Sequence, residues 1–153
     1  MKPDDTSDFG AVWLAGSRET SSWAVWSEWR HRTYAVLPTG ALWDVIAMPQ
    51  HRLTSAAEYR REAWTDVPIL ADLGAGQVYV WVPAATARTW AVPGTTALGP
   101  PWWIAVPRPG GPQVPEHQWI AAPGRSPRLM DPEALREALL AAPAPGTREE
   151  SGA

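Results

Sequence analysis

The apolar positions of residues 33–48 form two runs on either side of Pro38-Thr39-Gly40. Turn residues between two apolar runs are typical of a β-hairpin, so we predict a hairpin here. In the second run, strand alternation places Asp44 on the same face as Leu42, Ile46 and Met48. A carboxylate on an otherwise apolar face costs free energy unless a partner satisfies it. Asp44 is therefore the leading candidate for a functional residue.

A second hairpin is predicted for residues 68–82, where a glycine-containing turn follows Asp72. Gly74 and Gly76 supply only the first two glycines of a dinucleotide-binding fingerprint, so that motif is absent and the turn interpretation holds. The strand after the turn has two faces: Val78, Val80 and Val82 lie on one, and Gln77, Tyr79 and Trp81 lie on the other.

Helices are indicated at three places in the sequence. Tryptophans at positions 23, 26 and 29 have helical spacing within residues 17–32. Ser55 and Glu58 form a Ser-x-x-Glu capping box, which predicts a helix ending near Trp64. Asp131 and Pro132 have the order typical of a helix start, and they predict a closing helix. The remaining elements are a short strand at residues 9–14, a short helix at 84–90, a loop at 92–101, and strands at 102–106 and 118–121.

These elements predict the α+β class, as a single compact domain. We expect β-hairpins to form a mostly antiparallel sheet, accompanied by two to four short helices. Residues 17–142 make up the expected domain, which suits a chain of 153 residues. Residues 1–16 are expected to be a flexible arm, and residues 143–153, after the closing helix, a disordered tail.

Tryptophan is unusually frequent, with 11 residues against a single phenylalanine. Packing in the core and in grooves is the preferred interpretation of these rings, and a stacking surface for bases or for a partner protein is the alternative. The net charge of −3 argues against broad electrostatic capture of nucleic acid. A protein is therefore the expected partner, while a local patch leaves room for nucleic acid or a nucleotide.

Several kinds of site are excluded or disfavoured by the sequence. The chain has no cysteine, which rules out disulfides, thiolate metal sites and cysteine nucleophiles. No apolar stretch reaches the roughly 18 residues of a membrane span, and the acidic N-terminus lacks a signal-peptide core. We expect a cytoplasmic protein without membrane contact. His31, His51 and His117 lack ligand spacing, and we interpret them as ordinary histidines.

Asp44 has two interpretations besides a free functional acid. It could converge with Asp72 on a neighbouring strand as a metal-binding pair, although a turn role for Asp72 before Gly74 is preferred. Alternatively, Asp44 is a buried structural acid paired with an arginine such as Arg52 or Arg88, which we rank slightly above a catalytic role.

The order of these pieces resembles one known family. The run Leu-Trp-Asp-Val-Ile-Ala-Met, then Gly-Gln-Val-Tyr-Val-Trp-Val-Pro, then Trp-Trp-Ile-Ala-Val-Pro and Gln-Trp-Ile-Ala-Ala-Pro is similar to the N-terminal domain of bifunctional primase–polymerases, within the archaeo-eukaryotic primase superfamily, and especially to its short actinobacterial-type relatives. The resemblance covers about residues 33–141 and rests mainly on strand order and on Pro and Gly punctuation.

The resemblance implies a metal-dependent active site that this chain does not complete. Active members hold divalent metal with Asp-x-Asp, use a histidine on a following strand for the nucleotide, and add a third acid. Asp44 matches the first acid, but Ile46 stands at the second position and Gln77 at that of the histidine. Leu-Gly-Pro-Pro precedes Trp102 without an acid. One carboxylate is too few for two-metal phosphoryl transfer.

We therefore expect a primase–polymerase-like domain that has lost catalysis and acts as a binding or protein-interaction module without a cofactor. Its cleft is predicted to be lined by Asp44, Arg52, Gln77 and Tyr79, with Trp81 and Trp103 available for stacking. Two alternatives remain open. One is an active nucleotidyltransferase that uses Mg²⁺ or Mn²⁺ at an atypical site. The other is an unrelated structural or regulatory domain.

Overall fold

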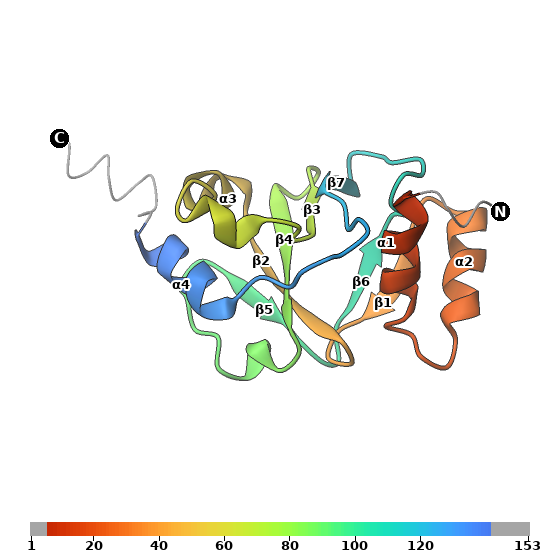
Figure 1. Ribbon diagram of the computed structural model, residues 1–153, viewed down its shortest axis with the longest axis horizontal. Coiled ribbons are helices and arrows are strands. Elements are labelled where there is room, and N and C mark those ends of the chain that lie inside the picture. Colours follow the sequence, from red (N-terminus) through yellow and green to blue (C-terminus); the bar gives the residue numbers. More distant parts are fainter. Residues whose placement is uncertain (1–5, 142–153) are drawn as a thin grey trace.

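The computed structural model describes residues 6–141, which form a single α+β domain (Figure 1). The α-helices of this part of the chain are α1 (Thr6–Ala15), α2 (Ser22–His31), α3 (Gln50–Ala56) and α4 (Pro132–Ala141). Its strands are β1 (Ala35–Pro38), β2 (Trp43–Pro49), β3 (Ile69–Asp72), β4 (Gln77–Pro83), β5 (Thr96–Leu98), β6 (Trp103–Val106) and β7 (Gln118–Ala121). Two 3-10 helices, η1 (Arg61–Trp64) and η2 (Thr86–Arg88), complete the set. The predicted fold class is confirmed.

The strands form two antiparallel sheets. The larger sheet has the order β5-β2-β4-β3-β7, and β2 pairs with β4 from Trp43 opposite Pro83 to Pro49 opposite Gln77. The smaller sheet contains β1 and β6. The predicted hairpin of β3 and β4 is confirmed by their pairing, and β6 and β7 fall at the predicted positions.

The predicted hairpin of residues 33–48 is wrong, because β1 and β2 belong to different sheets. Gly40 has a φ of +95° and donates its N–H to the Trp43 carbonyl at 2.7 Å, so the chain does turn there. Six consecutive residues of β2 are buried, however. The backbone N–H and C=O groups of a buried strand need partners on both edges, and β2 finds them in β4 and β5, which leaves no edge for β1.

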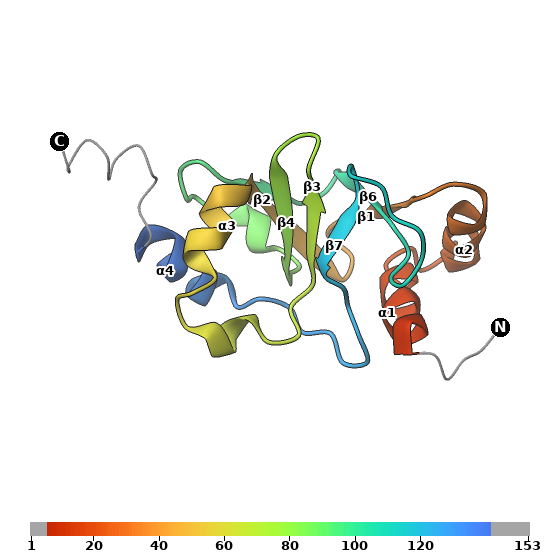
Figure 2. The ribbon, with the colours of Figure 1, turned by 90° about the horizontal axis from the view of Figure 1, so that it is seen from above.

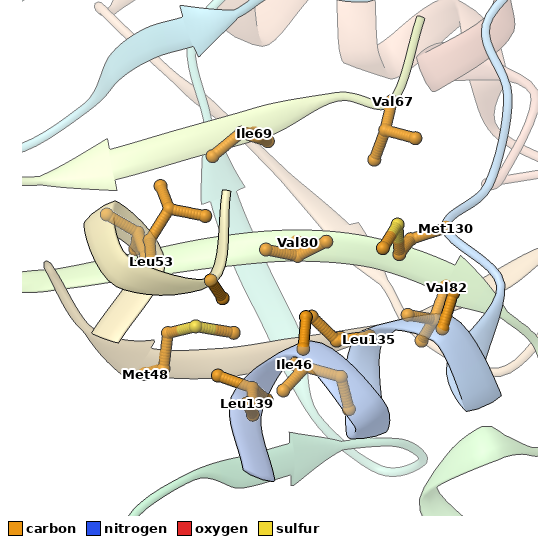
Figure 3. Close-up of a cluster of buried hydrophobic side chains, with 14 of the residues drawn as sticks. Ile46, Met48, Leu53, Val67, Ile69, Val80, Val82, Met130, Leu135 and Leu139 are labelled. Atoms are coloured by element: carbon orange, nitrogen blue, oxygen red, sulfur yellow. The ribbon is translucent and has the colours of Figure 1, made fainter. Parts of the chain in front are cut away.

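One face of the larger sheet packs against α3 and α4 (Figures 1 and 2). The valines of β4 lie on this face, as their alternation predicts, together with Ile46 and Met48 of β2 (Figure 3). Leu53 of α3 and Leu135 and Leu139 of α4 close the cluster from the helical side. This burial fixes both helices against the sheet.

The other face of the larger sheet is covered by the β1–β6 sheet with α1 and α2 (Figures 1 and 2). Its centre is a column of indole rings, in which Trp43 lies 6.2 Å from Trp13 and 5.5 Å from Trp81, and Trp81 lies 5.4 Å from Trp119. Trp43 and Trp81 are fully buried. The packing interpretation therefore holds for these rings, which fill the core with few residues.

The N-terminal segment differs from the prediction. A strand was expected at residues 9–14 within a flexible arm, but residues 6–15 form α1. Ala11, Leu14 and Ala15 are buried, at helical spacing, so the apolar run covers the indole column as a helix. Residues 1–5 and the expected tail at 143–153 lie outside the described residues.

The predicted capping box is also wrong. Helix α3 begins directly after Pro49 and ends at Ala56, so Ser55 lies in its last turn. Arg60, the residue before η1, has a φ of +53°, so no continuous helix runs from α3 to Trp64. The early start lets Leu53 and Ala56 reach the core. The predicted helix at 84–90 shortens to the single turn of η2, and the loop at 92–101 contains β5.

The helices predicted within residues 17–32 and after Asp131 are confirmed as α2 and α4. Asp131 caps α4 by accepting the Ala134 N–H at 3.2 Å. Helix α2 spans the tryptophans expected on one helical face, but Trp23 is 72 % exposed, whereas Trp26 and Trp29 pack against the core. Three residues cover 300° of a helical turn, so a repeat of three drifts off one face.

We predict that Gly10→Ala lowers the free energy of unfolding by about 2 kcal/mol or more, because overpacking of a close contact typically costs about 1–3 kcal/mol. A Cβ at Gly10 would lie 1.9 Å from the Pro123 carbonyl oxygen. Urea unfolding measures the loss. Gly124→Ala is the matched control, since nothing lies within 4 Å of its Cβ position. Equal stability of the two variants would contradict the docking of α1 described here.

Candidate functional site

The leading candidate residue, Asp44, lies on β2 and is fully buried. Its Oδ2 accepts the Ala87 N–H of η2 at 2.9 Å. Its Oδ1 is buried without a hydrogen-bond partner among the described residues. Most buried polar atoms in proteins have a partner. Six buried side-chain nitrogen or oxygen atoms within residues 6–141 lack one, and Asp44 Oδ1 is the only oxygen among them.

An arginine does not supply the missing partner, so the predicted ion pair is wrong. Arg52 donates from Nη1 to the Pro93 carbonyl oxygen at 3.1 Å, away from Asp44. Arg88 is exposed, and within residues 6–141 neither arginine forms a salt bridge with Asp44. The structure thus leaves Asp44 with a single neutral donor.

A cavity of about 460 Å³ borders Asp44, and we call it the Asp44 pocket. Its walls are mostly small or apolar groups, supplied by Gly40, Ala84, Ala85, Ala87, Ala97, Gly99 and Pro100. Arg88 and Trp102 are its larger lining side chains. The pocket therefore combines small, mostly apolar side chains with one acid and one base, a pattern common in ligand sites.

A second cavity of about 400 Å³ lies on the opposite face of the β5 edge, and we call it the Tyr79 pocket. The alternation of β5 separates the two cavities: Ala97 lines the Asp44 pocket, while Thr96 and Leu98 line the Tyr79 pocket. Trp102 lines both cavities. The edge of the sheet at β5 is thus hollowed on each side of one exposed tryptophan.

The Tyr79 pocket contains several polar groups. Burial, together with the nearby charge of Asp72, raises the pKa of the Tyr79 hydroxyl above its ordinary value. His117 also lines the cavity, and its Nδ1 is buried without a partner among the described residues. The His117 ring lies 5.1 Å from that of Tyr34.

The structure distributes the predicted site residues over separate places. Asp44 borders one pocket, and Tyr79 and Trp103 line the other. Gln77 pairs with Pro49, whereas Asp44 pairs with Val82. Gln77 and Val82 are separated by five steps along β4, or about 17 Å at about 3.4 Å per residue.

The two other predicted residues cannot serve the expected cleft. Trp81 is fully buried in the indole column and has no ring face open to a base. Arg52 lines neither pocket. A common cleft of the six predicted residues is therefore absent from the described part of the chain.

Asp72 has the predicted turn role, because its Oδ1 accepts the Ala75 N–H at 3.2 Å. It lies at the end of β4 opposite to Asp44, so the alternative of a metal-binding pair is wrong. Across residues 6–141, no group of three or more His, Cys, Asp or Glu side chains is placed to hold a metal ion.

Sequence reasoning missed Trp102 as the residue shared by the two pockets. It is 57 % exposed, and its neighbour Trp103 is 54 % exposed. The Trp-Trp pair carried a signal, because adjacent strand residues point to opposite faces and only one of them can join a one-sided core. Ala87 carried no such signal, since it acts through its backbone N–H.

Comparisons with protein-family models, with curated proteins and with solved structures found no match to this chain. None of the helices within residues 6–141 has the length and apolarity that crossing a membrane requires.

We predict that Asp72→Asn lowers the pKa of the Tyr79 hydroxyl, because it removes a negative charge that disfavours the phenolate. Absorbance titration of tyrosine ionisation measures the shift, and Tyr79→Phe assigns the step among the three tyrosines. An unchanged titration curve in Asp72→Asn would contradict the Tyr79 pocket geometry.

The same raised pKa predicts a dependence of stability on alkaline pH. The folded state holds the Tyr79 proton more tightly, so its stabilisation is complete below the ordinary tyrosine pKa of about 10 and is lost as the pH rises through the folded-state pKa. Tyr79→Phe therefore loses less stability than the wild type over this range, as measured by urea unfolding. The exposed Tyr59 provides the control Tyr59→Phe, which should follow the wild type.

Proposed function

We propose that this chain is a non-catalytic binding domain that engages a partner protein at the β5 edge, through the Asp44 pocket and the exposed Trp102 and Trp103. The cytoplasm remains its expected compartment. We further propose that the domain shares an ancestor with primase–polymerase domains. The distance between Asp44 and Gln77 weighs against a shared active site of that kind and favours the alternative of an unrelated domain.

The observation that carries this proposal is the unpartnered oxygen of Asp44. Burying a neutral polar group without a hydrogen bond costs about 2–7 kcal/mol, and burying an ionised carboxylate costs more. An apolar residue at this position of β2 would avoid that cost. Asp44 lines the cavity, so a donor that enters the cavity from outside the chain approaches the carboxylate, and this supports a binding role for the retained acid.

The nature of the surface supports a protein partner. Trp102 and Trp103 are more than half exposed and adjacent, and tryptophan is enriched in the energetically dominant parts of protein interfaces. The net charge of −3 offers little long-range attraction for a nucleic-acid backbone. Exposed tryptophans beside the Asp44 pocket, which contains an acid and a base, suit a protein partner better than a nucleic acid.

A catalytic role has less support from the arrangement of side chains. Two-metal phosphoryl transfer requires several oxygen ligands around both ions. Within residues 6–141, Asp44 is the only acidic residue that lines its pocket, and Asp72 lies beside the opposite end of β4. We therefore propose no metal cofactor for this site.

The proposal predicts that Asp44→Asn abolishes capture of the partner. Tagged protein is used to capture partners from a lysate of the cells that produce it, with and without nuclease, and the captured proteins are identified by mass spectrometry. The amide oxygen of Asn still accepts the Ala87 N–H, so the variant removes the charge and keeps the structural bond. Wild type and the control Asp66→Asn, which changes an exposed acid outside both pockets, should retain the same protein after nuclease treatment.

Two results would end the proposal. One is retention of the partner by Asp44→Asn at the wild-type level. The other is loss of all captured material on nuclease treatment, which would identify a nucleic acid as the ligand.

A further inference from the structure

The ligand that fits the Asp44 pocket must bring N–H donors and positive charge. An ionised carboxylate only accepts hydrogen bonds, and one oxygen of Asp44 has no donor in the described part of the chain. Its other oxygen is already bonded to the Ala87 N–H, which orients the carboxylate. A cationic donor makes a shorter and stronger bond to such an oxygen than a neutral one does.

The walls of the pocket favour a cation on an aliphatic stem. Ala84, Ala97 and Pro100 present only apolar side-chain atoms to the cavity. Gly99 lies against the carboxylate, since a Cβ there would be 3.4 Å from Asp44 Oδ2 and 2.8 Å from the Ala87 Cβ. The missing side chain keeps bulk away from the acid, and methylene groups of a ligand can pack along the remaining wall.

Trp102 favours a planar cation over a compact one. Its indole lines the pocket and is more than half exposed. A guanidinium stacks on an aromatic face, carries five donors and is more weakly hydrated than an ammonium, so it loses less on entering a dry recess.

We infer that the Asp44 pocket receives an arginine side chain of the partner protein, followed or preceded by an acidic residue that pairs with Arg88. The inference rests on the proposed function and names the group that the same site recognises. Arg88 lines the pocket but is exposed, so solvent screens its repulsion of an incoming arginine. It forms no salt bridge within residues 6–141, and its charge is therefore available to an acid beside that arginine.

The test uses short synthetic peptides and the intact protein. The probe is acetyl-Gly-Asp-Arg-Gly-amide, compared with peptides in which citrulline or lysine replaces the arginine. Citrulline keeps the length and planarity of the side chain and removes its charge. Calorimetry gives the Kd, and ¹H–¹⁵N spectra follow the Ala87 amide and the Trp102 indole.

The arginine peptide should bind at least tenfold more tightly than the citrulline and lysine peptides, and it should shift the Ala87 and Trp102 signals. Asp44→Asn should weaken its binding at least tenfold. The control Asp66→Asn should leave it unchanged, because Asp66 is exposed and lines neither pocket. Arg88→Gln should weaken binding severalfold. With a peptide that has Asn in place of its Asp, Arg88→Gln should have no such effect.

Equal Kd values for arginine and citrulline, or for arginine and lysine, would overturn the inference. Failure of every peptide to bind would also overturn it, and if Asp44-dependent capture of a protein persisted, the proposed function would survive with another ligand class. If capture from lysate were indifferent to Asp44 as well, the two proposals would fall together.

Discussion

The pairing of β2 with β4 is the constraint on which the rest of the structure depends. Because the register is continuous from Trp43 to Pro49, it determines which side chains face each core. Aliphatic groups on one face hold α3 and α4, and the indoles of Trp43 and Trp81 on the other face hold the β1–β6 sheet and the N-terminal helices (Figures 1 and 2). Each fully buried large side chain contributes about 1.5–3 kcal/mol, so the two cores together outweigh any single polar contact.

The register of β2 places Asp44 at a buried position, although the other buried residues of this strand are apolar. The surrounding segments do not neutralise it: Ala87 provides one N–H, Arg52 bonds to the Pro93 carbonyl, and Arg88 forms no salt bridge with Asp44 within residues 6–141. Local conflicts with the rules of folding concentrate at functional sites, where stability is exchanged for activity or binding. Asp44 lies beside the β5 edge, where two pockets and two exposed tryptophans mark the proposed binding surface.

The sequence was informative where structure follows from local pattern. Alternation predicted the faces of β4, and Asp131 predicted the start of α4. It failed where partners are distant: β1 and β2 follow each other along the chain but pair in different sheets. The alternation of β2 alone identified Asp44 as the leading candidate. Ala87, 43 residues away, bonds to Asp44, and Trp102 shares its pocket, and both relations arise only from the fold. The exclusion of Trp81 from any ligand contact likewise required the indole column, which no local pattern encodes.

The central claim is that the charge of Asp44 serves a ligand rather than the fold. Its most direct test is the free energy of unfolding of Asp44→Asn without any ligand, measured in urea against the wild type. The account predicts a value within about 1 kcal/mol of the wild type or above it, because the amide keeps an acceptor for Ala87 and removes a buried charge. A loss of about 3 kcal/mol or more, the usual cost of breaking a buried ion pair, would contradict it and assign the carboxylate to the structure.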